Sequence, residues 1–136
     1  MKTFARILTL ALAVALLAVM LVSCAPAKDP DKAVEALKKE EYTVAKDSSG
    51  VPAALTLFGV KGVDCVVTGT KTVENKDGEK TTEKVLIVYF TDAGSAKNAV
   101  DKVRSYYESE KDAKEDWKQS GKRVYAGTAA GIKAAR

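Results

Sequence analysis

Two cysteines are the only thiols in a chain of 136 residues that contains no histidine. Without an imidazole, catalytic triads built on histidine, histidine metal sites and imidazole acid–base catalysis are excluded. Cys24 directly follows a long apolar run near the N-terminus, whereas Cys65 lies within the β-branched stretch 63–67. Because the sequence around the two thiols differs, we consider the chemistry of each cysteine separately.

The segment before Cys24 has the layout of a secretory signal. Lys2 and Arg6 give residues 1–6 two positive charges and no negative one, and residues 7–22 carry no charge at all. A basic start followed by a short apolar stretch is typical of an export signal, while a membrane-spanning helix needs about 20 apolar residues. An uncleaved N-terminal anchor is the alternative, but no basic stop-transfer cluster follows the apolar run.

The run Leu21-Val22-Ser23-Cys24 resembles the lipobox of bacterial lipoproteins. The resemblance implies that a diacylglyceryl group, with fatty acyl chains such as palmitate, is attached to the Cys24 thiol. It also implies cleavage between Ser23 and Cys24, so that Cys24 begins the mature chain and its amino group is open to acylation. An ordinary signal peptide that ends by chance beside a cysteine is the alternative.

This resemblance divides the chain into a lipoprotein signal peptide (1–23), an acylated tether (24–28) and one domain (29–136). A single acyl chain gives only reversible membrane binding, whereas two chains anchor a protein stably, so no polybasic patch is needed. Loss of Lys2 and Arg6 lowers the net charge from +4 to +2, which indicates no nucleic-acid partner. We expect the protein on the extracytoplasmic face of the cell membrane, held by its lipid.

Once Cys24 is acylated, Cys65 is the only thiol, and no intramolecular disulfide can form. Its β-branched neighbours predict a small buried residue on a strand. A reactive or intermolecular thiol is the alternative, although no basic residue adjoins Cys65 in the chain to lower its pKa.

Motifs for catalysis or cofactors are weak. Asp64, Glu83 and Asp92 lie near predicted strands, but sequence spacing does not pair them at the roughly 5 to 9.5 Å that two catalytic carboxylates need. Ser120-Gly121-Lys122 lacks the upstream glycine and the following helix of a phosphate loop. The chain has no zinc ligand set and no calcium loop, so we expect no metal and no cofactor beyond the covalent lipid.

Aromatic residues with neighbouring cations form the one candidate binding surface. Its members are Tyr106, Tyr107, Trp117, Tyr125, Lys122 and Arg123. Such a combination can bind a glycan, a peptide or a lipid headgroup. Tyr106 and Tyr107 are adjacent on a predicted helix, so at least one should be partly exposed. The alternative is that Trp117 folds back over the sheet or the helix end as a core residue.

Hydrophobic periodicity, capping residues and turn residues predict the elements that must position these side chains. The predicted helices are 30–41, 52–58, 93–110 and 129–135, and the predicted strands are 42–45, 63–73, 81–90 and 121–127. Residues 52–58 also fit a strand by alternation, although Pro52 and Gly59 favour the helix, in which Leu55 and Phe58 would face inward. Residues 111–118 are predicted to be a solvated helix end or loop.

Without the terminal helices the predicted order is βαββαβ, which is that of the ferredoxin-like fold. We therefore expect an α+β domain in which a four-stranded antiparallel sheet carries helices on one face. The six apolar residues at 85–90 predict a central strand that is buried on both faces.

Signal, size and layout together resemble the small surface lipoproteins of Gram-positive bacteria that have no assigned activity. The resemblance implies a non-enzymatic module that binds an envelope protein, a peptide or a wall component. The alternative is a small envelope enzyme using carboxylate or tyrosine chemistry. Two facing carboxylates in a cleft would favour the enzyme, and an exposed aromatic patch would favour the binding protein.

Overall fold

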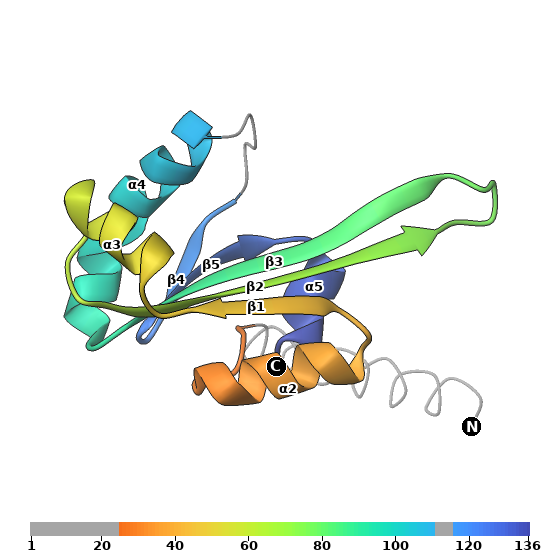
Figure 1. Cartoon of the computed structure of the whole chain (residues 1–136), viewed down its shortest axis with the longest axis horizontal. Coiled ribbons are helices and arrows are strands. Elements are labelled where there is room, and N and C mark those ends of the chain that lie inside the picture. The colour runs from red at the N-terminus through yellow and green to blue at the C-terminus, as the bar shows by residue number, and fades with distance from the viewer. Residues whose placement is uncertain (1–24, 111–115) are drawn as a thin grey trace, which may run out of the picture.

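The computed structural model describes residues 25–110 and 116–136, so the signal peptide, the Ser23–Cys24 cleavage site and the lipidation site lie outside the described residues. This part of the chain forms four helices and five strands, and Figure 1 shows how they are arranged. Their order is α2 (Pro30–Lys39), β1 (Thr43–Asp47), α3 (Gly50–Leu57), β2 (Val63–Glu74), β3 (Lys80–Phe90), α4 (Ala93–Glu110), β4 (Lys118–Ser120), β5 (Arg123–Gly127) and α5 (Ala129–Ala134).

Three of the helices begin at the side-chain caps that the sequence predicts. Each of these caps accepts a hydrogen bond from a backbone N–H in the first turn of its helix. The cap of α2 is Asp29 (2.9 Å), that of α4 is Asp92 (2.7 Å) and that of α5 is Thr128 (3.1 Å). Each cap satisfies a backbone N–H that has no partner within its helix. Residues 50–57 also form a helix, which confirms that the segment predicted as a helix at 52–58 is not a strand.

The five strands form one antiparallel sheet in the order β1-β2-β3-β5-β4. The α+β class is confirmed, but the expected four strands and ferredoxin-like order are wrong. In the observed sheet β3 lies between β2 and β5, and β1 pairs with the outer side of β2.

The unexpected strand β4 is the fifth strand of the sheet. It pairs antiparallel with β5, so the chain reverses between these two strands. On its other side β5 pairs antiparallel with β3, from the pair Val85 and Gly127 to the pair Tyr89 and Arg123. Gly121, at φ +55°, lies in the turn between β4 and β5.

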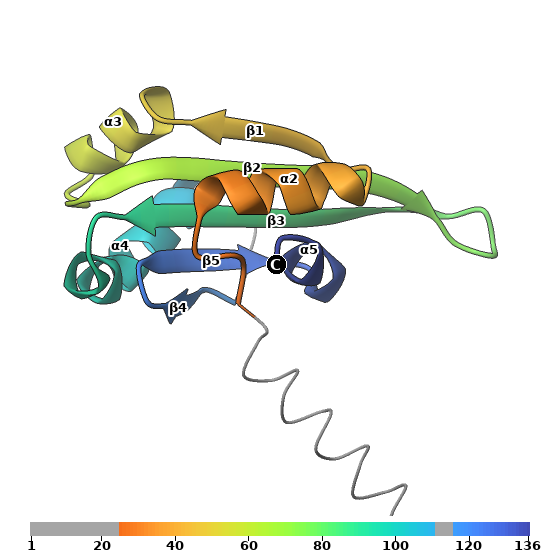
Figure 2. The same cartoon turned by 90° about the horizontal axis from the view of Figure 1, so that it is seen from below.

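Helices cover both faces of the sheet, which corrects the expectation that they share one face (Figures 1 and 2). Side chains alternate along the strands, so that Val66 packs under α3 and α4 while its neighbours Cys65 and Val67 pack under α2 and α5. The central strand β3 supplies both cores, with Val88 on one face and Ile87 on the other. The predicted burial of residues 85–90 on two faces is therefore confirmed.

Two glycines allow α5 to approach the backbone of β3. A Cβ atom at Gly131 would lie 2.2 Å from the Lys84 carbonyl oxygen, and one at Gly127 would lie 2.3 Å from it. The Thr128 N–H donates to the same oxygen at 2.8 Å. Only glycine fits this contact, which places α5 beside α2 on the sheet.

Within residues 25–110 and 116–136, none of the helices combines the length and the apolar character that crossing a bilayer requires.

Candidate functional site

The end of helix α3 turns two large apolar side chains outward. Gly59, at φ +98°, follows the helix, and its N–H donates to Thr56 while the N–H of Val60 donates to Leu55. This pair of backbone bonds is the Schellman motif, which commonly brings the residue after the glycine against the last inward-facing residue. Leu55 and Val60 are accordingly both fully buried in the same core.

Because Leu55 and Val60 take the inward positions, Leu57 and Phe58 are left at the surface. Leu57 is 91% exposed and Phe58 is 45% exposed. We expected Phe58 to face inward as part of the helix. That expectation is wrong, because the helix ends at Leu57 and Phe58 is its half-exposed cap.

Phe58 begins a row of four aromatic rings that leads from the surface into the core. Its ring lies edge-on to Tyr106 at 5.7 Å between centroids, and Tyr106 lies edge-on to Tyr107 at 5.0 Å. Tyr107 stacks on Trp117 at 5.2 Å. Edge-on and offset contacts of this kind are favourable beyond the area they bury.

Exposure falls along this row. Tyr106 and Tyr107 are both half-buried, as their adjacent positions on α4 predict, while Trp117 is 6% exposed and belongs to the core beneath α4. We call Leu57, Phe58 and Tyr106 the apolar tip. It lies where the end of α3 meets the side of α4 (Figure 1).

The predicted aromatic surface is therefore divided by the sheet. Tyr125 and Arg123 are buried, and Tyr125 belongs to the core on the opposite face, under α2 and α5. Lys122 is exposed at the turn between β4 and β5. Tyr106, Tyr107 and Trp117 do come together, and the structure adds Leu57 and Phe58, which sequence reasoning missed.

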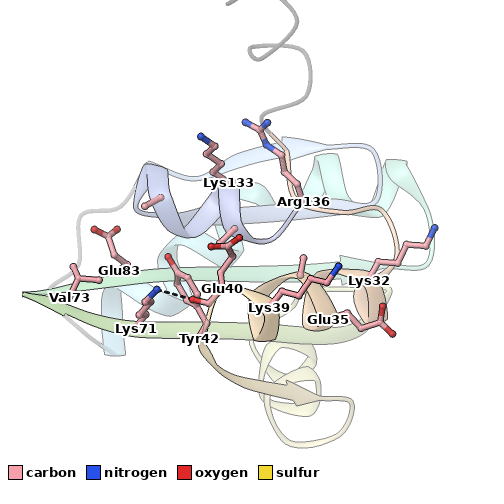
Figure 3. A pocket seen from close by; sticks show the side chains of 13 residues that line it. Lys32, Glu35, Lys39, Glu40, Tyr42, Lys71, Val73, Glu83, Lys133 and Arg136 are labelled. Atoms are coloured by element: carbon pink, nitrogen blue, oxygen red, sulfur yellow. Dashed lines mark hydrogen bonds between the residues drawn. The ribbon is translucent and has the colours of Figure 1, made fainter.

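A groove of about 800 Å³ lies between α2 and α5, apart from the apolar tip (Figure 3). Its lining carries cations and carboxylates in a mixed arrangement. The cations are Lys32, Lys39, Lys71, Lys133 and Arg136, and the carboxylates are Glu35, Glu40 and Glu83. A groove with charges of both signs suits a polar ligand without a large net charge.

Tyr42 is the aromatic residue of this groove. Lys71 lies over its ring at 5.7 Å and donates a hydrogen bond to the Glu40 carbonyl at 2.8 Å. Burial raises the pKa of the Tyr42 phenol, and the charges of Glu83 and Glu40 raise it further. The phenol is consequently neutral at pH 7 and can donate a hydrogen bond, but it cannot serve as a base.

The carboxylates considered for catalysis occupy separate places. Asp92 caps α4, where its Oδ1 and Oδ2 accept from the N–H and hydroxyl of Ser95 at 2.7 and 2.9 Å. These hydrogen bonds lower the pKa of Asp92. Glu83 lines the α2–α5 groove, and Asp64 is exposed on β2. Asp92 is thus committed to a helix cap.

Cys65 is buried on β2, as its sequence neighbours predict. Burial raises the pKa of its thiol to about 11, and the charge of Asp64 acts in the same direction. Both effects oppose formation of the thiolate, which is the reactive species.

Within the described ranges, no group of three or more Cys, Asp or Glu side chains could hold a metal ion. Comparison with known proteins adds no family assignment, because no family model, curated protein or solved structure matches this chain.

Proposed function

We propose that this chain is a lipid-anchored, non-enzymatic binding protein on the extracytoplasmic face of the cell membrane, and that its apolar tip binds an envelope protein. The anchor is the diacylglyceryl group expected on Cys24. The tip supplies the contact with the partner.

The exposure of Leu57 carries this proposal. A leucine that is 91% exposed contributes almost nothing to the stability of the isolated domain. Full burial of such a side chain against a partner contributes about 1.5–3 kcal/mol. The neighbouring Phe58 and Tyr106 enlarge the same surface, and aromatic residues are enriched where proteins meet.

The local fold supports a fixed presentation of this surface. The two hydrogen bonds of the Schellman motif hold the chain on either side of Phe58. Lys102 of α4 also donates to the Gly59 carbonyl at 3.1 Å, which ties the end of α3 to α4. A surface that is already ordered loses little conformational entropy when a partner binds. An apolar segment of a protein is the partner that such a surface fits.

Site-specific photocrosslinking in intact cells tests the proposal. A photoreactive phenylalanine analogue at position 57 should give discrete protein adducts that are absent when the analogue is at Lys76, an exposed residue of the β2–β3 turn. Adding Phe58→Ala to the position-57 probe should weaken those adducts. Identical adduct patterns from positions 57 and 76 would contradict the proposed site.

The variant Leu57→Asp supplies a second test. Since the side chain is exposed, the substitution should change the free energy of unfolding by about 0.5 kcal/mol or less. It should nevertheless abolish capture of the partner identified by crosslinking. A domain that unfolds, or a partner that is still captured at full strength, would argue against a docking role for Leu57.

A further inference from the structure

The residues directly after Cys24 are packed onto the domain. We call Ala25–Ala27 the strap. Pro26 is fully buried, and Ala25 and Ala27 contact the core under α2 and α5. The Ala27 N–H donates to the Ala135 carbonyl at 2.8 Å, which joins the strap to the end of α5.

Two buried side chains of the sheet also bind the strap. The Tyr89 hydroxyl donates to the Ala27 carbonyl at 2.7 Å, and Arg123 donates to the Pro26 carbonyl. Tyr89 and Arg123 are paired across β3 and β5, so both side chains leave the same face of the sheet. Buried polar groups are costly unless they are hydrogen-bonded, and the strap provides acceptors for both.

Because the strap is packed on the domain, it does not act as a free spacer between the lipid and the domain. Four freely extended residues, 25–28, would span roughly 13 Å, at about 3.3 Å for each residue. In contrast, the Cα atom of Cys24 is only about 3.8 Å from that of Ala25, which is already part of the domain. A lipid on Cys24 would therefore keep the surface around the strap close to the bilayer.

The end of α5, which the strap adjoins, is basic, whereas the carboxylates of the α2–α5 groove lie on β3 and on or just after α2. Lys28 follows the strap, and α5, to which the strap is bonded, carries Lys133. Arg136 is exposed just beyond α5, and residues 128–136 contain no acidic side chain. Figure 3 shows Lys133 and Arg136 on the α5 side of the groove, opposite the α2 side chains.

We propose that the strap mounts the domain directly on the membrane, with the end of α5 against the headgroups and with Lys28 and Lys133 binding anionic lipid phosphates. This inference rests on the lipidation of Cys24 in the proposed function. It adds a fixed orientation and a lipid class. The basic α5 surface and an anionic bilayer are complementary in charge, and each cation held near such a surface favours the contact by about fivefold.

Labelling of the mature lipidated protein, reconstituted in vesicles, tests the proposal. One probe is Ala130→Cys on α5 and the other is Asp77→Cys in the β2–β3 turn, and both positions are exposed. The vesicles contain either phosphatidylcholine alone or phosphatidylcholine with phosphatidylglycerol. A water-soluble maleimide should label position 130 more slowly in the anionic vesicles, while position 77 should react at the same rate in both.

Two changes should remove the protection of position 130. Lys28→Glu with Lys133→Glu should weaken the anionic-lipid effect by at least about thirtyfold, since two cations are lost and two anions are added. The matched control is Lys76→Glu with Lys80→Glu, which makes the same change of charge in and beside the turn and should leave the protection intact. Six glycine and serine residues inserted between Cys24 and Ala25 should release the domain and make position 130 as reactive as position 77.

Intact mass measured on the same sample distinguishes a failure of the proposed membrane orientation from a failure of the lipid anchor. If the lipid is present and position 130 reacts equally in both vesicle types, the mounting is refuted while the anchor stands. If the lipid is absent, the proposed function fails, and the mounting fails with it. Protection of position 130 that persists after the linker insertion would also overturn the role of the strap.

Discussion

Replacing Tyr89 by phenylalanine removes one hydroxyl and leaves the buried ring in place. That hydroxyl donates a 2.7 Å hydrogen bond to the Ala27 carbonyl, and the residue is 3% exposed. Burial raises the pKa of the Tyr89 phenol, although the nearby Arg123 charge opposes the shift, so the hydroxyl remains a donor throughout the neutral range. Tyr89→Phe thus isolates one contact between the sheet and the strap.

The size of the effect follows from that single bond. A hydrogen bond inside a protein contributes about 1 kcal/mol net, and a buried carbonyl left without its donor costs about 1–3 kcal/mol. Because the strap can detach locally and let the Ala27 carbonyl meet water, we expect a loss near the lower end, about 1–1.5 kcal/mol. That loss corresponds to a roughly tenfold larger equilibrium constant for opening of the strap.

Amide hydrogen exchange at Ala27 is the direct assay, because the Ala27 N–H donates to the Ala135 carbonyl across the docked strap. It should be followed by NMR on the chain from residue 24 with Cys24→Ser. The control is Tyr42→Phe, which removes a hydroxyl on the same face of the sheet at a position outside the strap contacts. Unchanged exchange at Ala27 in Tyr89→Phe, or equal acceleration in Tyr42→Phe, would show that the Tyr89 hydroxyl does not hold the strap.

Four further predictions concern buried residues. Trp117→Ala should lower the free energy of unfolding by about 3–5 kcal/mol, because Trp117 is buried against Tyr107; a loss below about 1 kcal/mol in denaturant titrations would contradict this. Gly131→Ala should lower the melting temperature despite the better helix propensity of alanine, because its Cβ atom would lie 2.2 Å from the Lys84 carbonyl oxygen. Ala130→Gly, at the neighbouring exposed position, measures the effect of helix propensity alone. A higher melting temperature for Gly131→Ala would count against the close contact between α5 and β3. Cys65 should react with a disulfide reagent at pH 8 at least about 100-fold more slowly in the folded chain than in denaturant, because burial raises its pKa from 9.0 to about 11. The folded state then holds this proton more tightly than the unfolded state, so the stability that Cys65 contributes is present below pH 9.0 and is lost as the pH rises toward 11, and Cys65→Ala should flatten that loss.

The helices were largely predictable because their signals are local. Asp29, Asp92 and Thr128 mark three helix starts, and Gly59 marks the end of α3, since each residue satisfies or redirects a backbone group within a few positions. The hairpin of β2 and β3 is local too, because Asn75 and Gly78 form its turn.

The order of the strands was not predictable in the same way. The order depends on pairings between segments that are distant in the sequence, such as β3 with β5. It also depends on the polar strand β4, which lacks the apolar alternation that predicts a strand. The short run Lys118–Ser120 is extended because β5 offers it a hydrogen-bonding edge. Local propensity carries no information about that edge.

The candidate site was predicted in part. The aromatic row was visible in the sequence as Tyr106, Tyr107 and Trp117, but the exposed end of the row was not. Its signal was the pair Leu57-Phe58 immediately before Gly59. A Schellman ending assigns the inward contact to Leu55 and Val60, which leaves Leu57 and Phe58 outside.

Intact mass spectrometry of the protein extracted from the membranes of bacteria that express it can detect the lipid anchor itself. We expect a chain that begins at Cys24 and carries the added mass of a diacylglyceryl group, and we expect Cys24→Ala to abolish both features. A chain that retains Met1 and carries no lipid would contradict the proposed lipid anchor.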